Sequence, residues 1–335
     1  MFLSVIVPIY NPGEHLRACL DSLLQQDLPG DLYEIICVDD GSTDNSPEIL
    51  REYSGMAPNL RVIRQENEGV VSARNTGMKL AAGEYIWLVD ADDFVKENCM
   101  SFLYEKVKAE NCDRLIFGAY QFQDMLTSEE QDSLARGTLP VNAPWYDAVV
   151  WRCLLRKNFL KRNRLFFRYP ELTHGEDGLF MYEVCASEPK EAVVDEVLYL
   201  YRVHEGSAET KTDTAHCRKK IRSFVRIAEI LEKYRKSGRK DPGTANLLMT
   251  FLWMALYETA GLPAIQRKEV VKEIRGKGLF PYCRPAECTL HCSFMTERTD
   301  WVGKGFDYGY RHLHRLWGFW LFCVLKDTVR LFGGK

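Results

Sequence analysis

Short apolar runs alternate with helical patterns through the first 120 residues, and this alternation constrains the fold more than any other feature. The runs are rich in β-branched or other apolar residues and read as strands at Val5–Ile9, Glu34–Val38, Leu60–Ile63 and Tyr85–Val89. Strands separated by helices favour right-handed βαβ units and a mainly parallel sheet. We therefore expect an α/β fold with a mixed, mainly parallel, Rossmann-like sheet flanked by helices.

The segments between the strands carry helical signals. Leu16, Leu20 and Leu23 recur at helical spacing, and an Asn11-Pro12 pair precedes them as a helix-start signal. The remaining expected elements are helices at 42–53, 70–82 and 98–109, a strand at Asp113–Phe122, a mobile loop at 123–147, a helix at Trp151–Leu160, a strand at Val193–Tyr201 and only helices from about 211 onward.

Charge divides the chain into two parts of opposite sign. Residues 1–210 contain 20 basic and 35 acidic side chains, a net charge of −15, and residues 211–335 contain 24 basic and 12 acidic ones, a net charge of +12. Such a split indicates parts that face different surroundings. We therefore expect one domain at 1–210 and a basic helical region at 211–335. The strongly acidic first part argues against a nucleic-acid partner.

Targeting signals are weak. The chain opens directly on a strand pattern with no cationic segment or cleavage site, which does not suit a signal peptide. The longest apolar run, Leu316–Leu325, has about half of the ~18–20 residues that span a bilayer. Eleven scattered cysteines are more typical of reduced thiols than of a disulfide scaffold. We therefore expect a cytoplasmic protein.

Acidic clusters follow the ends of predicted strands, at Asp39-Asp40, at Asp90-Ala91-Asp92-Asp93 and at Glu176-Asp177. Ligands of open α/β sheets bind beyond the carboxyl ends of the strands, and an unpaired carboxylate is too costly to bury in a core. The three carboxylates of the second cluster repel one another unless a cation neutralises them. Mg²⁺ or Mn²⁺ bridging to a diphosphate supplies that neutralisation. Helix capping and turn formation are the alternative roles for these carboxylates.

These clusters belong to a longer pattern that closely resembles inverting family 2 glycosyltransferases with the GT-A fold. The resemblance covers about the first 95 residues and continues more weakly through Trp151–Leu160, Gly175–Asp177 and Tyr201–Ser207. The matching stretches are Ser4-Val-Ile-Val-Pro-Ile-Tyr-Asn11, Val38-Asp-Asp-Gly-Ser-Thr-Asp44, Asn67-Glu-Gly69, Ala73-Arg-Asn75 and Gly83-Glu-Tyr-Ile86 through Asp93.

The resemblance implies a site for a nucleotide-sugar, with a preference for UDP. Tyr10 would offer an aromatic face to uracil, Asp40 would accept the uracil N3–H, and Arg74 would touch the sugar-phosphate. The donor-site residues that it implies are Pro8, Tyr10, Asn11, Asp40, Asn67, Arg74, Asp90, Ala91, Arg202 and Ser207.

The resemblance also implies a metal site and a catalytic base. Asp90 and Asp92 match the Asp-x-Asp motif that binds Mn²⁺ or Mg²⁺, with Asp92 as the direct ligand, and Asp177 matches the base. Inverting transfer needs a carboxylate to take the acceptor's proton and a cation to hold the departing diphosphate. A helix N-terminal acidic pair, favoured by the helix dipole, is the alternative role for Glu176 and Asp177 and is compatible with catalysis.

A later segment, Tyr201–Ser207, resembles the part of the family that closes over the diphosphate. His204 could bind the metal as a neutral imidazole, and the guanidinium of Arg202 matches phosphate geometry. An exposed polar strand edge is the alternative. The spacing of the cysteines and histidine within 283–292 does not match a zinc site.

The basic region carries two apolar stripes. The first runs from Ile221 to Leu231, and the second from Leu313 to Leu325 beside a cationic face at Arg311 and Arg315. An aromatic stripe with a cationic face is typical of a helix lying on an anionic membrane surface. Packing on the first domain or on a second subunit, as in a homodimer, is the alternative.

We therefore expect a metal-dependent, inverting hexosyltransferase that takes part in surface polysaccharide synthesis, peripherally at the inner face of the cell membrane. Its acceptor would be a glycan or a lipid-linked glycan. Because the chain lacks a Gln-x-x-Arg-Trp motif, addition of one or a few sugars is favoured over polymer extrusion. Two alternatives are an Asp-based phosphoryl-transfer hydrolase, which Phe94 disfavours, and a non-catalytic membrane-associated adaptor with the same fold.

Overall fold

Helices cover a sheet in the first of two compact units, Met1–Thr210, and the second unit begins at Lys211. The computed structural model describes residues 1–142, 149–204, 207, 211–237 and 242–279. The helices of the first unit are α1 (His15–Leu24), α2 (Ser46–Met56), α3 (Val70–Leu80), α4 (Met100–Glu110), α5 (Ser128–Ala135), α6 (Lys157–Arg162) and α7 (Glu176–Cys185).

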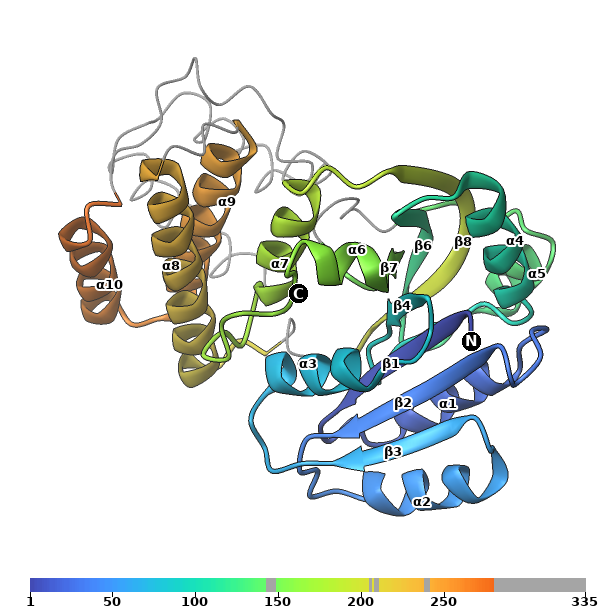
Figure 1. Cartoon of the computed structure of the whole chain (residues 1–335). Coiled ribbons are helices and arrows are strands. Elements are labelled where there is room, and N and C mark those ends of the chain that lie inside the picture. Colours follow the sequence, from blue (N-terminus) through green and yellow to red (C-terminus); the bar gives the residue numbers. More distant parts are fainter. Residues whose placement is uncertain (143–148, 205–206, 208–210, 238–241, 280–335) are drawn as a thin grey trace. The chain divides into compact units, whose positions relative to one another are not determined.

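The sheet has the strand order β3-β2-β1-β4-β7-β6-β8-β5 among the described residues (Figure 1). The first four strands of this order are parallel, as are β6 and β8, whereas β7 and β5 run antiparallel to their neighbours. The strands are β1 (Leu3–Ile9), β2 (Tyr33–Asp39), β3 (Leu60–Arg64), β4 (Tyr85–Leu88), β5 (Phe94–Val95), β6 (Arg114–Gln123), β7 (Cys153–Arg156) and β8 (Glu191–Val203). The prediction of a mixed, mainly parallel α/β sheet is confirmed.

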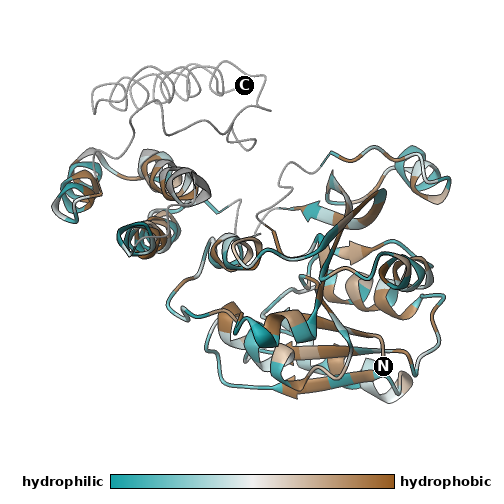
Figure 2. Ribbon diagram, turned by 45° about the horizontal axis from the view of Figure 1, so that its top comes forward, coloured by the Kyte–Doolittle hydropathy of each residue, from teal (hydrophilic) through white to brown (hydrophobic). Residues whose placement is uncertain are grey.

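Different helices cover the two faces of this sheet. Val5 and Val7 of β1 belong to the apolar cluster that includes side chains of α1, α2 and α4. Ile6, which points to the opposite face, belongs to the cluster of α3, α6 and α7. Burial on both faces explains why the strands read as continuous apolar runs. Figure 2 shows the mostly hydrophobic strands of this unit between helices that also carry hydrophilic residues.

Gly83 allows the chain to pass close to β1 before β4 begins. A Cβ at this position would lie 2.5 Å from the backbone nitrogen of Ser4 and 2.6 Å from the carbonyl carbon of Leu3. The Gly83 N–H donates to the Ser4 hydroxyl (2.8 Å), which donates to Glu34 (2.6 Å). A side chain at this position would therefore force β4 away from β1.

Residues 151–160 do not form the single helix that the sequence predicted. Cys153–Arg156 is a strand paired with both β4 and β6, and α6 begins only at Lys157. Periodicity alone cannot distinguish a short apolar strand from a buried helix. The backbone groups at the facing edges of β4 and β6 need partners, and β7 supplies them.

The predicted loop at 123–147 contains a helix, so that prediction is wrong in part. α5 starts with a capping box, in which the Glu130 N–H donates to the Thr127 hydroxyl and the Thr127 N–H donates to the Glu130 carboxylate (2.7 Å). No side chain of α5 is buried, so no apolar stripe marked it. The Thr-x-x-Glu spacing was the available signal.

The described part of the second unit consists of helices α8 (Thr214–Lys236), α9 (Pro242–Glu258) and α10 (Ala264–Gly276), with a 3₁₀ turn at Thr259–Gly261. The apolar side chains predicted between Ile221 and Leu231 are buried, and Arg218, Lys219 and Arg222 are exposed. The second stripe and the cysteines within 283–292 lie outside the described residues. Among the residues described, no helix is both long and apolar enough to cross a membrane.

Candidate active site

The polar clusters predicted from the sequence meet at one edge of the sheet. β1 and β2 run parallel, and Ile9 at the end of β1 pairs with Asp39 at the end of β2. β4 runs parallel to β1 as well, so Tyr10, Asp40 and Asp90 all follow strands that end at this edge. Ligands of open α/β sheets bind at such an edge.

The predicted donor-site residues at this edge differ in exposure. Tyr10 keeps 53% of its surface exposed and Asn67 is exposed as well, whereas Pro8 is half-buried within β1. Ala91 is buried and belongs to the apolar cluster under α1. The Tyr10 ring and Asn67 are therefore accessible to a ligand, and the Ala91 side chain serves the core.

Asn11 ties the end of β1 to the loop that follows β2. Its φ of 50° lies in the left-handed region, which asparagine tolerates better than most residues. Its side-chain oxygen accepts hydrogen bonds from the N–H groups of Thr43 (2.7 Å) and Asp44 (3.2 Å), and its own N–H donates to Ser42 (3.2 Å). Asn11 therefore shapes the loop beside Tyr10.

Asp40 is buried and organises the turn before α3. Its carboxylate accepts hydrogen bonds from the N–H groups of Glu68 (2.9 Å) and Gly69 (2.8 Å) and from the Gln65 amide (2.8 Å). A carboxylate offers about four lone-pair positions, so these three donors occupy most of them. In this structure Asp40 holds the Gln65–Gly69 turn in place, and its contact with uracil stays a prediction.

The carboxylates after β4 point to different partners. Asp93 is buried and accepts hydrogen bonds from the Tyr199 hydroxyl (2.6 Å) and the Arg202 N–H (2.7 Å). Burial, followed by the charges of Asp92 and Asp90, raises the pKa of Asp93 well above its usual range. Sequence analysis did not foresee that Asp93 joins this cluster to β8, because the contact depends on residues more than a hundred positions away.

Asp92 and His204 lie side by side, with Oδ2 and Nε2 3.2 Å apart. Within the described part of the chain, no three His, Cys, Asp or Glu side chains converge as a ready-made metal site. Asp90 is turned toward Arg74 instead. A carboxylate oxygen and an imidazole nitrogen nevertheless suit a divalent cation that takes its other ligands from a diphosphate and water.

Arg74 joins the two acidic motifs. The side chain is buried, and its Nη1 donates to Glu176 (2.8 Å) while its Nη2 donates to Asp90 (3.1 Å). Its guanidinium also lies over the Phe167 ring, 5.4 Å from the centroid. Burial lowers the pKa of Arg74, but the charges of Asp90 and Glu176 together outweigh burial, so the pKa is raised. Both Nη groups are thus committed to protein carboxylates in this structure.

Asp177 lies in the first turn of α7. The helix is preceded by Gly175, and the φ of this glycine, 75°, lies in the left-handed region. The carboxylate accepts a hydrogen bond from the Gly178 N–H (2.8 Å). Burial raises the pKa of Asp177 to about 7, the charge of Glu176 adds to the rise, and Arg74 opposes it. An aspartate with a pKa near neutrality is suited to general base catalysis.

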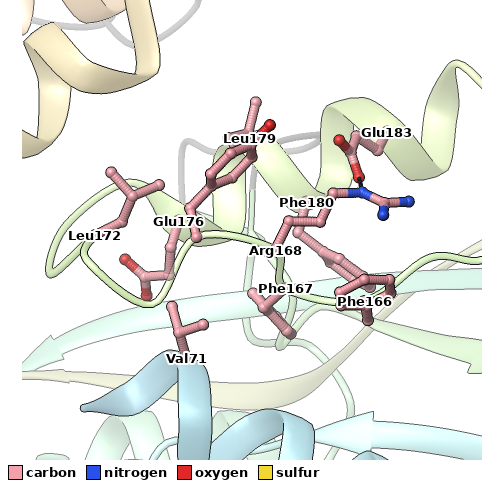
Figure 3. Close-up of a pocket in the computed structure, with 10 residues that line it drawn as sticks. Val71, Phe166, Phe167, Arg168, Leu172, Glu176, Leu179, Phe180 and Glu183 are labelled. Carbon is pink, nitrogen blue, oxygen red and sulfur yellow. Dashed lines mark hydrogen bonds and ion pairs between the residues drawn. The ribbon is translucent and has the colours of Figure 1, made fainter. Parts of the chain in front are cut away.

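A crevice borders Glu176 on the side of α7 (Figure 3). Phe166, Phe167, Leu172 and Phe180 form its apolar wall, with Val71 of α3 opposite them. Its free interior holds about one water molecule. The protein is therefore closely packed around Glu176, next to the expected base Asp177.

Arg202 and His204 come to the site from the end of β8. The Arg202 Nη1 lies 2.9 Å from Nδ1 of His15, and the rings of His15 and His204 have centroids 4.3 Å apart. Burial, followed by the charges of Arg202 and His204, lowers the pKa of His15. The N–H of Ser207 donates to the His204 carbonyl (3.4 Å). β8 pairs with β6 as far as Val203 and with β5 only at Tyr199 and Leu200. Sequence analysis missed His15, which stands outside every motif.

Comparison with known proteins gives a family for this architecture. The sequence model described as "Glycosyl transferase family 2" matches residues 4–186, more than half of the chain. The chain is also 35% identical over 219 residues to the uncharacterized glycosyltransferase EpsJ of Bacillus subtilis (strain 168). That match covers 61% of this chain and 62% of EpsJ, so the chain spans less than two thirds of this relative.

Two solved structures share the fold. S. aureus TarS 1–349 in complex with UDP-GlcNAc has a TM-score of 0.54 at 23% identity, covering 83% of this chain and 88% of that chain. The mannosyltransferase PcManGT from Pyrobaculum calidifontis, in complex with GDP-Man and Mn²⁺, has a TM-score of 0.53 at 16% identity, covering 99% and 88%. Both the family resemblance and the GT-A-like fold expected from the sequence are confirmed.

Proposed function

The chain belongs to glycosyl transferase family 2, and on that basis we propose that it transfers a sugar from a UDP-sugar to a hydroxyl group of a glycan acceptor, with inversion at the anomeric carbon. One observation carries the proposal. Buried Arg74 joins Glu176, the neighbour of the expected base, to Asp90 of the acidic cluster. The proton acceptor and the expected diphosphate site are therefore held at a fixed separation.

Asp177 is the base in the proposed reaction. The acceptor oxygen attacks the anomeric carbon, the bond from that carbon to the UDP oxygen breaks, and Asp177 takes the proton of the acceptor hydroxyl. A pKa of about 7 makes Asp177 a stronger base than an ordinary aspartate, and the side chain is still substantially ionised near neutral pH. In-line attack from the side opposite the leaving group inverts the anomeric carbon.

Asp92 and His204 would hold Mn²⁺ or Mg²⁺ in this proposal, with Asp90 beside them. The cation, when bound, supplies positive charge to the departing diphosphate. Arg202 and Ser207 would add donors to the same phosphates, and Arg202 suits this role because a guanidinium presents several N–H groups in one plane. The mannosyltransferase of similar fold was solved with Mn²⁺ and a nucleotide-sugar.

The donor nucleotide is assigned to the edge beside β1. We assign Tyr10 to stacking on the base, Asp40 to the uracil N3–H and Asn67 to the nucleotide. Pro8 and Asn11 complete this wall. The exposed ring of Tyr10 and the complex of TarS with UDP-GlcNAc support the assignment to a UDP-sugar.

The acceptor is assigned to the glycans or lipid-linked glycans of surface polysaccharide synthesis, at the cytoplasmic face of the membrane. The basic charge of residues 211–335 suits an anionic membrane surface. The second apolar stripe of the sequence, Leu313 to Leu325, would contact that surface or a second subunit, and it lies outside the described residues. The strong negative charge of residues 1–210 disfavours nucleic acid.

The test is transfer from a panel of nucleotide-sugars to simple aryl glycosides in the presence of Mn²⁺. We expect UDP release with at least one UDP-sugar and, by NMR coupling constants, a β-linked product from an α-linked donor. Asp177→Asn should lower turnover by about a thousandfold or more, while Asp195→Asn, the same change at an exposed aspartate, should not.

Two results would overturn the proposal. Undiminished transfer by Asp177→Asn would remove the base from its role. Retention of the α configuration in the product would exclude the inverting mechanism, even if transfer occurred.

A further inference from the structure

We propose that His15 is a positioning residue of the donor site, which fixes Arg202 through a hydrogen bond and His204 through ring packing. The inference rests on the proposed function, because it takes Arg202 and His204 as donor-site groups. No motif of the sequence includes His15, and its place follows from the contacts alone.

The hydrogen bond between His15 and Arg202 has a defined direction. A guanidinium carries only donors, so Arg202 Nη1 donates and His15 Nδ1 accepts, at 2.9 Å. The ring proton of His15 must then lie on Nε2. Phe94 and Phe122 flank the guanidinium, with centroids 5.6 and 5.7 Å away. The two phenyl rings offer no oxygen or nitrogen atom that could accept an N–H lying in the plane of the guanidinium. The hydrogen bond to His15 therefore sets the direction of Nη1.

The Arg202 side chain has few other polar contacts among the described residues. Its Nε is buried and has no hydrogen-bond partner within the described residues. Its backbone N–H is held by Asp93 (2.7 Å), which fixes the strand but not the side chain. Among the described residues, the contact with His15 is therefore the hydrogen bond that orients the Arg202 side chain, beside the aromatic contacts of Phe94 and Phe122.

The ring of His15 also limits the movement of His204. The two rings lie 4.3 Å apart at an interplanar angle of 57°, while the Nε2 of His204 faces Asp92 at 3.2 Å. His204 keeps only 13% of its side chain exposed. Packing by His15 on one part of the ring and the contact with Asp92 at its edge hold His204 toward the acidic cluster.

His15 comes to this contact from a part of the chain far from Arg202. His15 is the first residue of α1, directly after the loop that Asn11 fixes, whereas Arg202 lies 187 residues later on β8. β1 and β8 are separated in the sheet by β4, β7 and β6. Asp93 and the pairing of β5 already join the acidic cluster to β8, and His15 adds a side-chain contact from the start of α1.

Two substitutions separate the two contacts. His15→Phe keeps a ring against His204 but removes the acceptor for Arg202. His15→Asn places an acceptor near the position of Nδ1 but removes the ring. Calorimetric titration with UDP in EDTA reports the contribution of Arg202, and the gain in UDP affinity on adding Mn²⁺ reports that of Asp92 and His204.

We expect opposite patterns from the two variants. His15→Phe should raise the Kd for UDP in EDTA about tenfold, because a charged group loses its hydrogen bond, and should keep the gain from Mn²⁺. His15→Asn should bind UDP in EDTA within about twofold of wild type and lose most of the gain from Mn²⁺. His216→Phe makes the same change on α8 and should match wild type in both titrations.

The possible failures are distinguishable. If wild type binds no UDP under either condition, the proposed function fails and this inference fails with it. If wild type binds UDP and both His15 variants bind it equally well, the inference alone is overturned. It is also overturned if the two variants weaken UDP binding by the same factor in EDTA and in Mn²⁺. Thermal melting checks folding, and His15→Tyr, which also keeps a ring, replaces His15→Phe if that variant does not fold.

Discussion

An Asp177→Asn substitution is expected to abolish transfer and at the same time to make the protein more stable at neutral pH. Burial, together with the charge of Glu176, raises the pKa of Asp177 from 3.8 to about 7. The folded state is therefore penalised at pH values where the unfolded chain ionises freely. Asparagine has nearly the same shape and no charge, so it removes this penalty.

The size and pH range of the effect follow from the same shift. Below pH 3.8 the side chain is neutral in both states and costs nothing. Between pH 3.8 and 7 the folded state binds the extra proton, so wild type loses stability as the pH rises, and the loss is complete above 7. A shift of about three units at ~1.4 kcal/mol each sets an upper limit of about 4 kcal/mol. Because Asp177 is only half-buried, we expect about 2 kcal/mol.

Thermal melting of wild type and Asp177→Asn from pH 4 to pH 8 measures this effect. A domain of this size changes its melting temperature by about 2–4 °C per kcal/mol, so the difference between the two proteins should widen by about 4–8 °C over the range. Asp195→Asn, at an exposed position on β8, controls for a generic loss of charge. A difference that stays constant with pH would refute the assignment of a raised pKa to Asp177.

Three further predictions follow from the geometry. Because the base must be ionised, a pH–rate profile should show kcat/KM falling about tenfold per pH unit below about pH 7. A profile that stays flat down to pH 5 would contradict the role of Asp177. Arg74→Met should lower the free energy of unfolding in urea by about 3–5 kcal/mol, since it leaves the carboxylates of Glu176 and Asp90 partly buried without their cation. A loss below about 1 kcal/mol would show that the bridge is dispensable. Gly83→Ala should cost about 1–3 kcal/mol in the same assay, because its Cβ would meet the backbone of β1, and unchanged stability would mean that the strand shifts freely.

Local pattern was enough to predict the strands and helices of the first 95 residues. Val5–Ile9 and Glu34–Val38 are mostly apolar because both faces of β1 and β2 are buried, and each run ends at the polar residues of the site. The order of strands and helices, the acidic clusters and their common edge could therefore be read from the first 95 residues.

The sequence could not show what depends on distant contacts. Cys153–Arg156 is a strand because β4 and β6 lie on either side of it, and neither neighbour is visible in the local pattern. The same holds for Asp93, which read as one more carboxylate of the cluster and instead joins β8 through Tyr199 and Arg202. His15 gave no signal, since its partner stands 187 residues away.

Arg74 shows the same limit at the centre of the site. The sequence predicted a donor contact, and the structure adds a bridge between Glu176 and Asp90. A guanidinium matches a carboxylate and a phosphate equally well, so the residue type could not distinguish these partners. The fold decides, because α7 brings Glu176 over α3.

Calorimetric titration of UDP with and without Mn²⁺, on wild type, Asp92→Asn and Asp177→Asn, tests the central claim most directly. We expect wild type to bind UDP with micromolar affinity that depends on Mn²⁺, Asp92→Asn to lose the dependence on the metal, and Asp177→Asn to bind as wild type does while transferring no sugar. Absence of binding by UDP, GDP and dTDP with either Mn²⁺ or Mg²⁺ would contradict the assignment of a nucleotide-sugar site to this edge of the sheet.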